Sequence, residues 1–367
     1  MKKIFVLLVV LFFSNGLSVL AAEIPVLTIE EATRLAINNS TAIRNLQDNI
    51  ALTRENEQRI RDTMWAQQNI QAFEFVQMQA NLMRADASRA VHITNLNAQR
   101  ETLSFIVRQH FSNIILAQKE LELSDKDIAI MLQNLEIHRV MSSVGMASDA
   151  QLNTILSTYN QALHNRANLV SSLDNAFREL NRLMGTNQNN VYSLVFEPNF
   201  QPIGNININD YIRLHQNNNS QIENATRQAT IASFELEHHG QNFNPITGEV
   251  IPGGTTRHER EIAVTQANRN LDQLRETVEN NVVTLHNNIN NLELQINSAQ
   301  LQLEILLQEL SVLEIQYQVG QVTPITLNRK ALEIYRLQET LRRHKVNHSL
   351  LVMRLTNPNI VVATATA

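Results

Sequence analysis

Residues 289–320 decide the fold and read INNLELQINSAQLQLEILLQELSVLEIQYQVG. One set of apolar positions recurs in alternating steps of three and four residues, namely Ile289, Leu292, Ile296, Ala299, Leu303, Leu306, Leu310, Leu313 and Tyr317. This spacing predicts an α-helix with an apolar seam along one face. A second set keeps the same spacing two residues later, namely Leu294, Ser298, Leu301, Ile305, Gln308, Val312, Ile315 and Val319. At about 100° per residue the second seam lies on nearly the opposite face, so the helix needs a neighbour on each side.

A weaker pair of seams occurs in the first half of the chain. One comprises Ile114, Ala117, Leu121, Ile128, Met131 and Leu135, and the other comprises Leu116, Leu123, Ile130, Ile137, Val140 and Val144. Periodicity alone fits either the interior helix of a large bundle or the wall of a closed ring of helices. Helix length favours the ring, because one chain with such long helices can hardly bury both seams.

Glycine and proline divide the chain into very long uninterrupted stretches. Neither occurs between Pro25 and Gly145, from Thr255 to Val319, or from Ile325 to Asn357, and Gly185 alone interrupts the stretch between Met146 and Pro198. Such spacing predicts four long helices. A helix from about residue 84 to residue 143 would extend roughly 90 Å, which describes a rod or a tube rather than a globular domain.

The two halves of the chain resemble each other. Residues 29–39 align with residues 208–218, and Val144-Gly145 aligns with Val319-Gly320. This repetition predicts an all-α, internally duplicated fold. Its units are a first helical hairpin at 23–190, a linker at 191–206, a second hairpin at 207–357 and a tail at 358–367.

The N-terminus has the layout of a secretory signal peptide at residues 1–22. Lys2 and Lys3 precede an apolar stretch from Ile4 to Phe13, and small residues follow at Ala21 and Ala22. The alternative is a buried first helix of the mature domain. We expect export, with a mature chain that begins near Glu23 in the cell envelope.

Composition excludes several classes of function. The chain has no cysteine, which excludes disulfides, thiolate metal sites and a lipid-modified cysteine. The net charge is −5 and no long basic run occurs, so nucleic acid is not an expected partner. No apolar stretch after the N-terminal one approaches the ~20 residues of a membrane-spanning helix.

Both hairpins turn at the same short pattern, which we predict to be a functional tip. Val144 and Gly145 end one long helix, and Val319 and Gly320 end the other; in each, glycine supplies the left-handed stop. Ser148 is then placed to cap the next helix in a capping box with Gln151. Thr323 is placed to cap the matching helix, with Pro324 at its first position.

We find no catalytic constellation in the sequence and expect neither an enzyme nor a cofactor. His258-Glu259 begins like a zinc-protease motif, but Ile262 stands where the second histidine would be. The His238-His239 pair lacks carboxylates at metal-ligand spacing. Three aromatic residues could rim a membrane-facing end, but packing between helices is the favoured interpretation; they are Trp65, Phe73 and Phe75.

Three pieces of the chain resemble the TolC-like outer membrane efflux proteins. Residues 27–36 (LTIEEATRLA) resemble that family's opening helix, residues 178–185 (RELNRLMG) resemble the close of its first half, and residues 314–323 (EIQYQVGQVT) resemble its second tip. The resemblance covers nearly all of the mature chain. It implies a homotrimer in which each chain contributes four helical strands to a twelve-helix tube.

The resemblance also implies a function and its partners. The tube would be a passive exit duct of an efflux or export system, and its tips would meet a periplasmic adaptor and an inner-membrane pump. The exported substrate would be a small molecule or a protein. The alternative is a non-transporting adaptor or structural spacer of the envelope, although an adaptor would normally carry β-rich segments beside a single helical hairpin.

The chain departs from the family's pattern in two places. The family inserts a pair of β-strands between the long helices of each half, but residues 64–83 are helix-like and residues 240–257 form a short turn-rich loop. Neither has room for two strands of ~10 residues, so we expect little or no β-barrel. Second, Thr326 and Arg329 stand where family members often carry gate acids, so an acidic constriction does not carry over. These two residues are the candidate gate.

Overall fold

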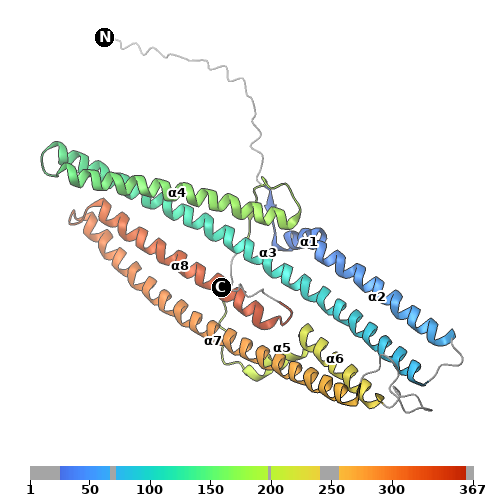
Figure 1. Ribbon diagram of the computed structural model, residues 1–367. Helices are drawn as coiled ribbons and strands as arrows, with labels where there is room; N and C mark the ends of the chain where they lie inside the picture. The colour runs from blue at the N-terminus through green and yellow to red at the C-terminus, as the bar shows by residue number, and fades with distance from the viewer. Residues whose placement is uncertain (1–24, 67–71, 197–199, 240–255, 361–367) are drawn as a thin grey trace, which may run out of the picture.

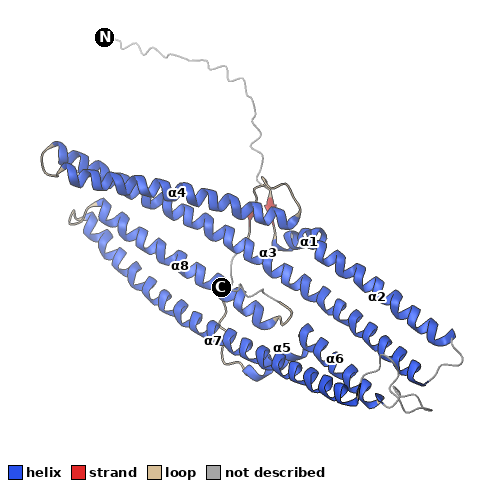
Figure 2. Cartoon of the chain, viewed as in Figure 1, coloured by secondary structure: helices blue, strands red, loops and turns tan. Residues whose placement is uncertain are grey.

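The computed structural model describes residues 25–66, 72–196, 200–239 and 256–360, with the side chains of residues 72 and 73 left out. The predicted signal peptide and residues 240–255 therefore lie outside the described residues. The described part is almost wholly helical (Figures 1 and 2), which confirms the predicted class. Its elements are β1 (Val26–Leu27), α1 (Ile29–Asn39), α2 (Thr41–Ala66), α3 (Ala72–Ser143), α4 (Asp149–Met184), β2 (Ser193–Leu194), α5 (Ile208–Asn217), α6 (Ser220–Glu237), α7 (Arg257–Gln318) and α8 (Pro324–Thr356).

Helices α3 and α7 run the length of an elongated molecule (Figure 1). The 72 residues of α3 extend about 110 Å at 1.5 Å per residue. Helices α4 and α2 pack on α3, α8 and α6 pack between α3 and α7, and neither α2 nor α4 packs extensively on α7. The described helices therefore form four side-by-side columns in the order α2/α4, α3, α6/α8 and α7.

The described helices are more numerous than the four that glycine and proline spacing predicts. The first half breaks after Asn39, where the Ser40 hydroxyl accepts a hydrogen bond from the backbone N–H of Ile43 at 3.3 Å. The second half breaks at Asn218, and the Asn219 side chain caps α6 by accepting from two backbone N–H groups. Serine and asparagine can end or start a helix without glycine or proline, because their side chains satisfy free backbone groups.

The core lies where the short helices meet the long ones. One cluster joins α1, α3 and α4 around Ala32, Phe111 and Leu180. A second joins α7 to the end of α8 through Val282, Ile289 and Leu355, with the inter-repeat linker packed against it. The parallel pair β1 and β2 ties the start of the described chain to the end of the first hairpin.

The two predicted seams of α7 have different environments. Ile289, Leu292, Ile296 and Leu306 of the first seam are buried within the chain. On the second seam, by contrast, exposed fractions are 68% for Leu294 and 63% for both Leu301 and Ile315. The single chain thus covers one apolar face of α7 and leaves the opposite face open to solvent.

A prediction concerns Gly185, which ends α4 in the left-handed conformation with φ +71°. A Cβ there would lie 2.5 Å from the Asn39 side chain, which donates to the carbonyls of Arg182 and Leu183. Gly204→Ala, at φ +62° with open space around it, should cost about 1–2 kcal/mol of unfolding free energy. Gly185→Ala should cost clearly more in the same urea titration. Equal losses would show that Asn39 is no packing constraint.

Candidate functional site: tube edges and hairpin tips

The two outer columns carry exposed apolar side chains. On α7 the open seam continues to Val312 and Val319, which are 54% and 64% exposed. On the opposite edge, Leu163 and Val170 of α4 are 40% and 42% exposed. Apolar side chains in water cost about 25 cal/mol per Å² relative to burial, so both edges favour association.

The predicted tips lie together at one end of the molecule (Figure 1). Gly145 and Gly320 have φ of +74° and +76°, as the left-handed stop requires. The residue after each glycine makes the same hydrogen bond in both turns. The N–H of Met146 donates to the carbonyl of Met141, and the N–H of Gln321 donates to the carbonyl of Gln316, both at 2.8 Å. The two turns are therefore structural copies.

The residues around the tip glycines are open to solvent. Val144 and Val319 are 63% and 64% exposed. Ser148 forms the predicted capping box with Gln151. The prediction that Thr323 caps α8 with its side chain is wrong in detail, because its hydroxyl lies 2.9 Å from the Thr326 hydroxyl instead of bonding a backbone N–H. Pro324, which has no N–H, occupies the first position of that helix.

The candidate gate residues lie where α8 faces α3. Arg329 donates from Nη2 to Oδ1 of Asn134 at 3.0 Å, and the neighbouring Asn328 donates to Gln133 at 3.2 Å. The Thr326 hydroxyl lies within hydrogen-bond distance of the Thr323 hydroxyl, at the start of its own helix. Arg329 thus links the two hairpins just above the tips.

The contact between α3 and α8 towards the tips is polar, a feature that sequence reasoning missed. Three bonds join Tyr335 to Glu122 at 2.7 Å, Arg336 to Asp127 at 2.8 Å and Arg343 to Glu120 at 3.3 Å. Exposed ion pairs contribute about 0–1 kcal/mol each. The two hairpins therefore adhere weakly to each other along this polar seam, which we define by those three pairs.

A second charge network joins the columns in the other half of the molecule. Arg89 of α3 bonds the buried Glu57 of α2 at 2.7 Å. Asp86 pairs with Arg89 and, at 3.5 Å, with Arg227 of α6. Glu235 of α6 pairs with Arg84 of α3 and Arg260 of α7. All four columns are linked by charge at this end.

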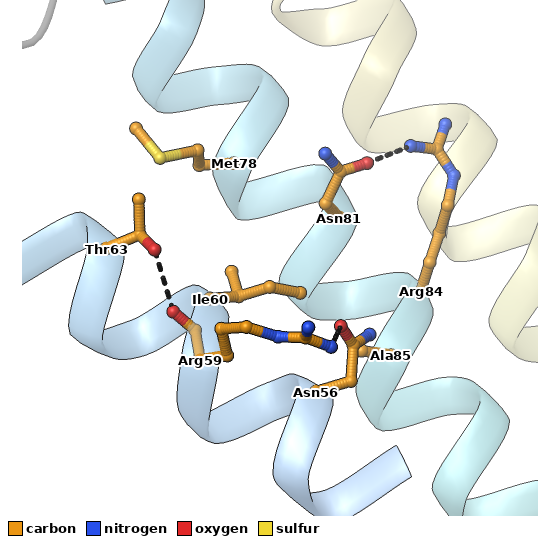
Figure 3. A pocket seen from close by; sticks show the side chains of 8 residues that line it. All are labelled: Asn56, Arg59, Ile60, Thr63, Met78, Asn81, Arg84 and Ala85. Atoms are coloured by element: carbon orange, nitrogen blue, oxygen red, sulfur yellow. Dashed lines mark hydrogen bonds between the residues drawn. The ribbon is translucent and has the colours of Figure 1, made fainter. Parts of the chain in front are cut away.

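A groove of about 590 Å³ opens between α2 and α3 near the end opposite the tips. Ile60 and Met78 extend into the space between the two helices (Figure 3). Arg59 runs across this space towards Asn56, and Arg84 points away from it. Four smaller or polar residues complete the lining, namely Asn56, Thr63, Asn81 and Ala85. The groove combines apolar side chains with guanidinium groups.

Two aromatic residues that the sequence singled out are exposed. Trp65, in the last turn of α2, is 86% exposed, and Phe75, at the start of α3, is 50% exposed. The favoured sequence interpretation, that these residues pack between helices, is therefore wrong for both. The Phe73 side chain lies outside the described residues.

His238, one of the histidines that the sequence singled out, has a local partner. Nδ1 of His238 lies 2.9 Å from the carbonyl of Phe234. Glu259 of the protease-like dipeptide is engaged in the capping box with Thr256. Among the described residues no cluster of three or more histidines and carboxylates could hold a metal ion, and no helix is long and apolar enough to span a membrane.

No family model and no curated protein matches the sequence. Solved structures do match. One of them is a structure of CusC, which undergoes conformational changes as it folds and forms a transmembrane channel. The match covers 90% of this chain and 91% of the CusC chain, with a TM-score of 0.67 and 12% identity. The CmeC outer membrane channel of Campylobacter jejuni covers 90% and 85%, with a TM-score of 0.62 and 11% identity.

The outer membrane protein VceC of Vibrio cholerae covers 89% of this chain and 95% of its own, with a TM-score of 0.60 and 12% identity. The chain has the fold of the TolC-like channels. The likeness spans about 90% of the chain and confirms, at the level of fold, the resemblance carried by the opening helix, the end of the first half and the second tip. CusC and CmeC are described as channels and VceC as an outer membrane protein, and at such low identity these likenesses establish the architecture alone.

A prediction concerns the polar seam at Glu122, whose pKa is lowered chiefly by the hydrogen bond from Tyr335 and further by Lys119. A lowered folded-state pKa stabilises the fold above the ordinary carboxyl pKa, and this contribution is lost as pH falls through the folded value. Tyr335→Phe should raise the pKa of Glu122 in a carboxyl NMR titration. It should lower stability at pH 7 by less than about 1 kcal/mol, since Glu122 is half exposed.

Tyr159→Phe is the matched control, because the Tyr159 hydroxyl makes no hydrogen bond within the described residues. The stability difference caused by Tyr335→Phe should vanish in acid, where Glu122 is protonated in both proteins. A Glu122 titration unchanged by Tyr335→Phe would show that the bond does not form in solution.

Proposed function

We propose that the chain is the passive exit duct of an efflux or export system in the cell envelope. The observation that carries the proposal is the open apolar seam of α7 at one edge of a four-column layer. A layer with exposed apolar side chains at both edges can bury them against further copies of the same chain. A ring of such layers has a hollow axis, and a hollow helical tube passes solutes without chemistry of its own.

The edges fit a head-to-tail ring. The α7 seam of one chain would pack on the α2/α4 column of the next, and such a heterologous contact repeats until the rotation closes. Resemblance to the channel family supports a ring of three chains, which would have twelve columns. The proposal places the homotrimer in the envelope, with export directed by residues 1–22.

The trimer is tested at Leu301 and Ile315, which are open to solvent in the single chain. Leu301→Asp with Ile315→Asp should leave the monomer folded by circular dichroism and reduce the trimer to monomer in light scattering, because a charge buried at the interface costs several kcal/mol. Gln302→Asp, on the exposed surface of the same helix, should leave the trimer intact. A wild-type monomer at micromolar concentration would exclude the tube.

The tips are the proposed docking surface for a periplasmic adaptor, and an inner-membrane pump would supply the energy. The exposed Val144 and Val319 flank the two glycine turns and give the tip an apolar surface. Two copies per chain would present six equivalent tips in the trimer. The transported substrate is a small molecule or a protein that passes through the tube along its axis.

Replacing the tip glycines tests the docking proposal. A Cβ at Gly145 or Gly320 would meet no atom within 4 Å, so the main cost of valine there is conformational, about 1–2 kcal/mol or more for a β-branched residue at positive φ. We expect splayed tips, lost export in cells and an intact trimer. Asparagine tolerates this conformation, so Gly145→Asn and Gly320→Asn should retain export. Full export with both valine variants would remove the tips from docking.

Thr326 and Arg329 are the proposed gate, since both lie one to two turns above the second tip. A ring of three Arg329 side chains would disfavour cations in the lumen. Arg329→Asp should therefore shift the conductance of the reconstituted tube towards cations, whereas Arg329→Gln should give an intermediate selectivity. Unchanged selectivity in all three intact trimers would exclude Arg329 from the lumen.

A further inference from the structure

A cavity of about 310 Å³ lies where the second hairpin meets its two short helices. Its walls come from the end of α5, the start of α6, residues 274–288 of α7, the last turn of α8 and residues 358–360. The volume is at the lower limit of ligand pockets, about 300–1,000 Å³, so the cavity suits a molecule the size of one sugar ring. Neither the proposed duct nor the tips involve this cavity.

Arg354, in the last turn of α8, gives the cavity a positive charge. Its side chain is half-buried, burial lowers its pKa, and it forms no ion pair within the described residues. Glu101 of α3 contacts the Asn359 amide at 3.5 Å instead. None of the described residues that line the cavity is acidic. A guanidinium taken partly out of water without an anion is costly, so a bound carboxylate would stabilise it.

His215, near the end of α5, gives the cavity a hydrogen-bond acceptor. The residue is 8% exposed, and its Nε2 lies 2.7 Å from the carbonyl of Leu355. A carbonyl can only accept, so Nε2 carries the ring proton. Burial lowers the pKa of His215, although the Leu355 carbonyl raises it, so the ring is neutral at pH 7. Nδ1 has no partner among the described residues, and a hydroxyl group is the donor that fits it.

Helix α7 contributes both amide and apolar side chains to the cavity. Asn281 and Asn288 lie two turns apart and are exposed. Val278 and Leu285 are each 9% exposed and form an apolar part of the wall. Amide groups donate and accept hydrogen bonds without carrying charge, so they match the hydroxyl groups of a sugar. Aliphatic side chains match the C–H groups of its ring.

We propose that this cavity binds a small polyhydroxy carboxylate, a sugar acid about the size of one hexose. The carboxylate pairs with Arg354, because a guanidinium group offers two parallel donors to it. One ligand hydroxyl donates to Nδ1 of His215, and others bond the amides of Asn281 and Asn288. A ligand held there connects α5, α6 and α8, and it therefore stabilises the break between α5 and α6.

A second copy of the chain does not compete for this cavity. The open seam of α7 includes Leu294 and Leu301, which lie at the edge of the four-column layer. At about 100° per residue, Asn288 is about 120° round the helix from Leu294 and about 140° from Leu301. The cavity therefore opens on a broad face of the layer and not on its edge. Monomer and trimer should bind the ligand alike, so the proposal does not rest on the duct.

Isothermal titration calorimetry of the full mature protein tests the site with four probes at one ionic strength. D-glucuronate has a carboxylate and hydroxyls, D-glucose has only the hydroxyls, acetate has only the carboxylate, and inorganic phosphate is an anion of another shape. We expect D-glucuronate to bind at least about tenfold more tightly than each of the others. It alone engages both Arg354 and the hydrogen-bonding groups, and a charge-assisted hydrogen bond contributes a factor of this size.

Two variants locate the ligand in the cavity. Arg354→Gln should weaken D-glucuronate binding by about tenfold or more, because it removes the cation. Asn281→Asp should weaken it to a similar extent, because it adds a negative charge beside the carboxylate. The matched controls on α7 are Arg269→Gln and Asn270→Asp, which change exposed residues outside the cavity and should leave binding unchanged. Circular dichroism checks that each variant is folded.

Three results would overturn the proposal. The first is the absence of D-glucuronate binding up to about 10 mM. The second is equal affinity for acetate or phosphate, which would reduce the cavity to an anion site that recognises no hydroxyl group. The third is equal binding of D-glucuronate by Arg354→Gln and the wild type, which would place the ligand elsewhere on the molecule.

Discussion

Helix α7 has apolar side chains on two opposite faces, and a single chain can cover only one of them. Contact with α8 buries Ile289 and Ile296, and α5 with the inter-repeat linker also packs on Ile289. Leu294, Leu301 and Ile315 stay in water. Burying a leucine contributes about 1.5–3 kcal/mol, so an uncovered row of such residues from Leu294 to Ile315 is a large driving force for association. The layered arrangement, the open edges and the proposed tube all depend on this one helix.

The contacts between columns are unequal in chemistry. Within a hairpin, α7 meets α8 through buried Leu292, Ile296 and Leu341. Between hairpins, α3 meets α8 through exposed pairs such as Arg336 with Asp127. Apolar contacts hold each hairpin together far more strongly than ion pairs in water hold one hairpin to the next.

Much of the fold was predictable, because long helices and tight turns depend on local sequence. The heptad spacing from Ile289 to Tyr317 predicts both faces of α7, and Gly145 and Gly320 predict the tips. The breaks at Ser40 and Asn219 were missed, since serine and asparagine favour helix caps but also occur inside helices of this chain, as Asn81 and Ser88 do in α3. The polar seam of Tyr335 and Glu122 was not predictable, because two residues 213 positions apart give no local signal.

The candidate sites were predictable in part for the same reason. The sequence identifies Arg329 as a gate candidate but not its bond to Asn134, and it identifies Trp65 but not its exposure. Exposure depends on where α2 ends relative to α3, which is a property of the packed molecule. Charge and groove at that end come from residues spread over four helices, and only the folded chain brings them together.

The central claim is that the open seam of α7 is covered by a copy of the chain in a closed, hollow ring. Electron microscopy of the purified full-length protein tests it most directly, because end-on particle images show symmetry and axis together. We expect end-on views with three-fold symmetry, a ring of helical density and an empty centre. Solid rods without a central lumen, or single four-column layers, would contradict it.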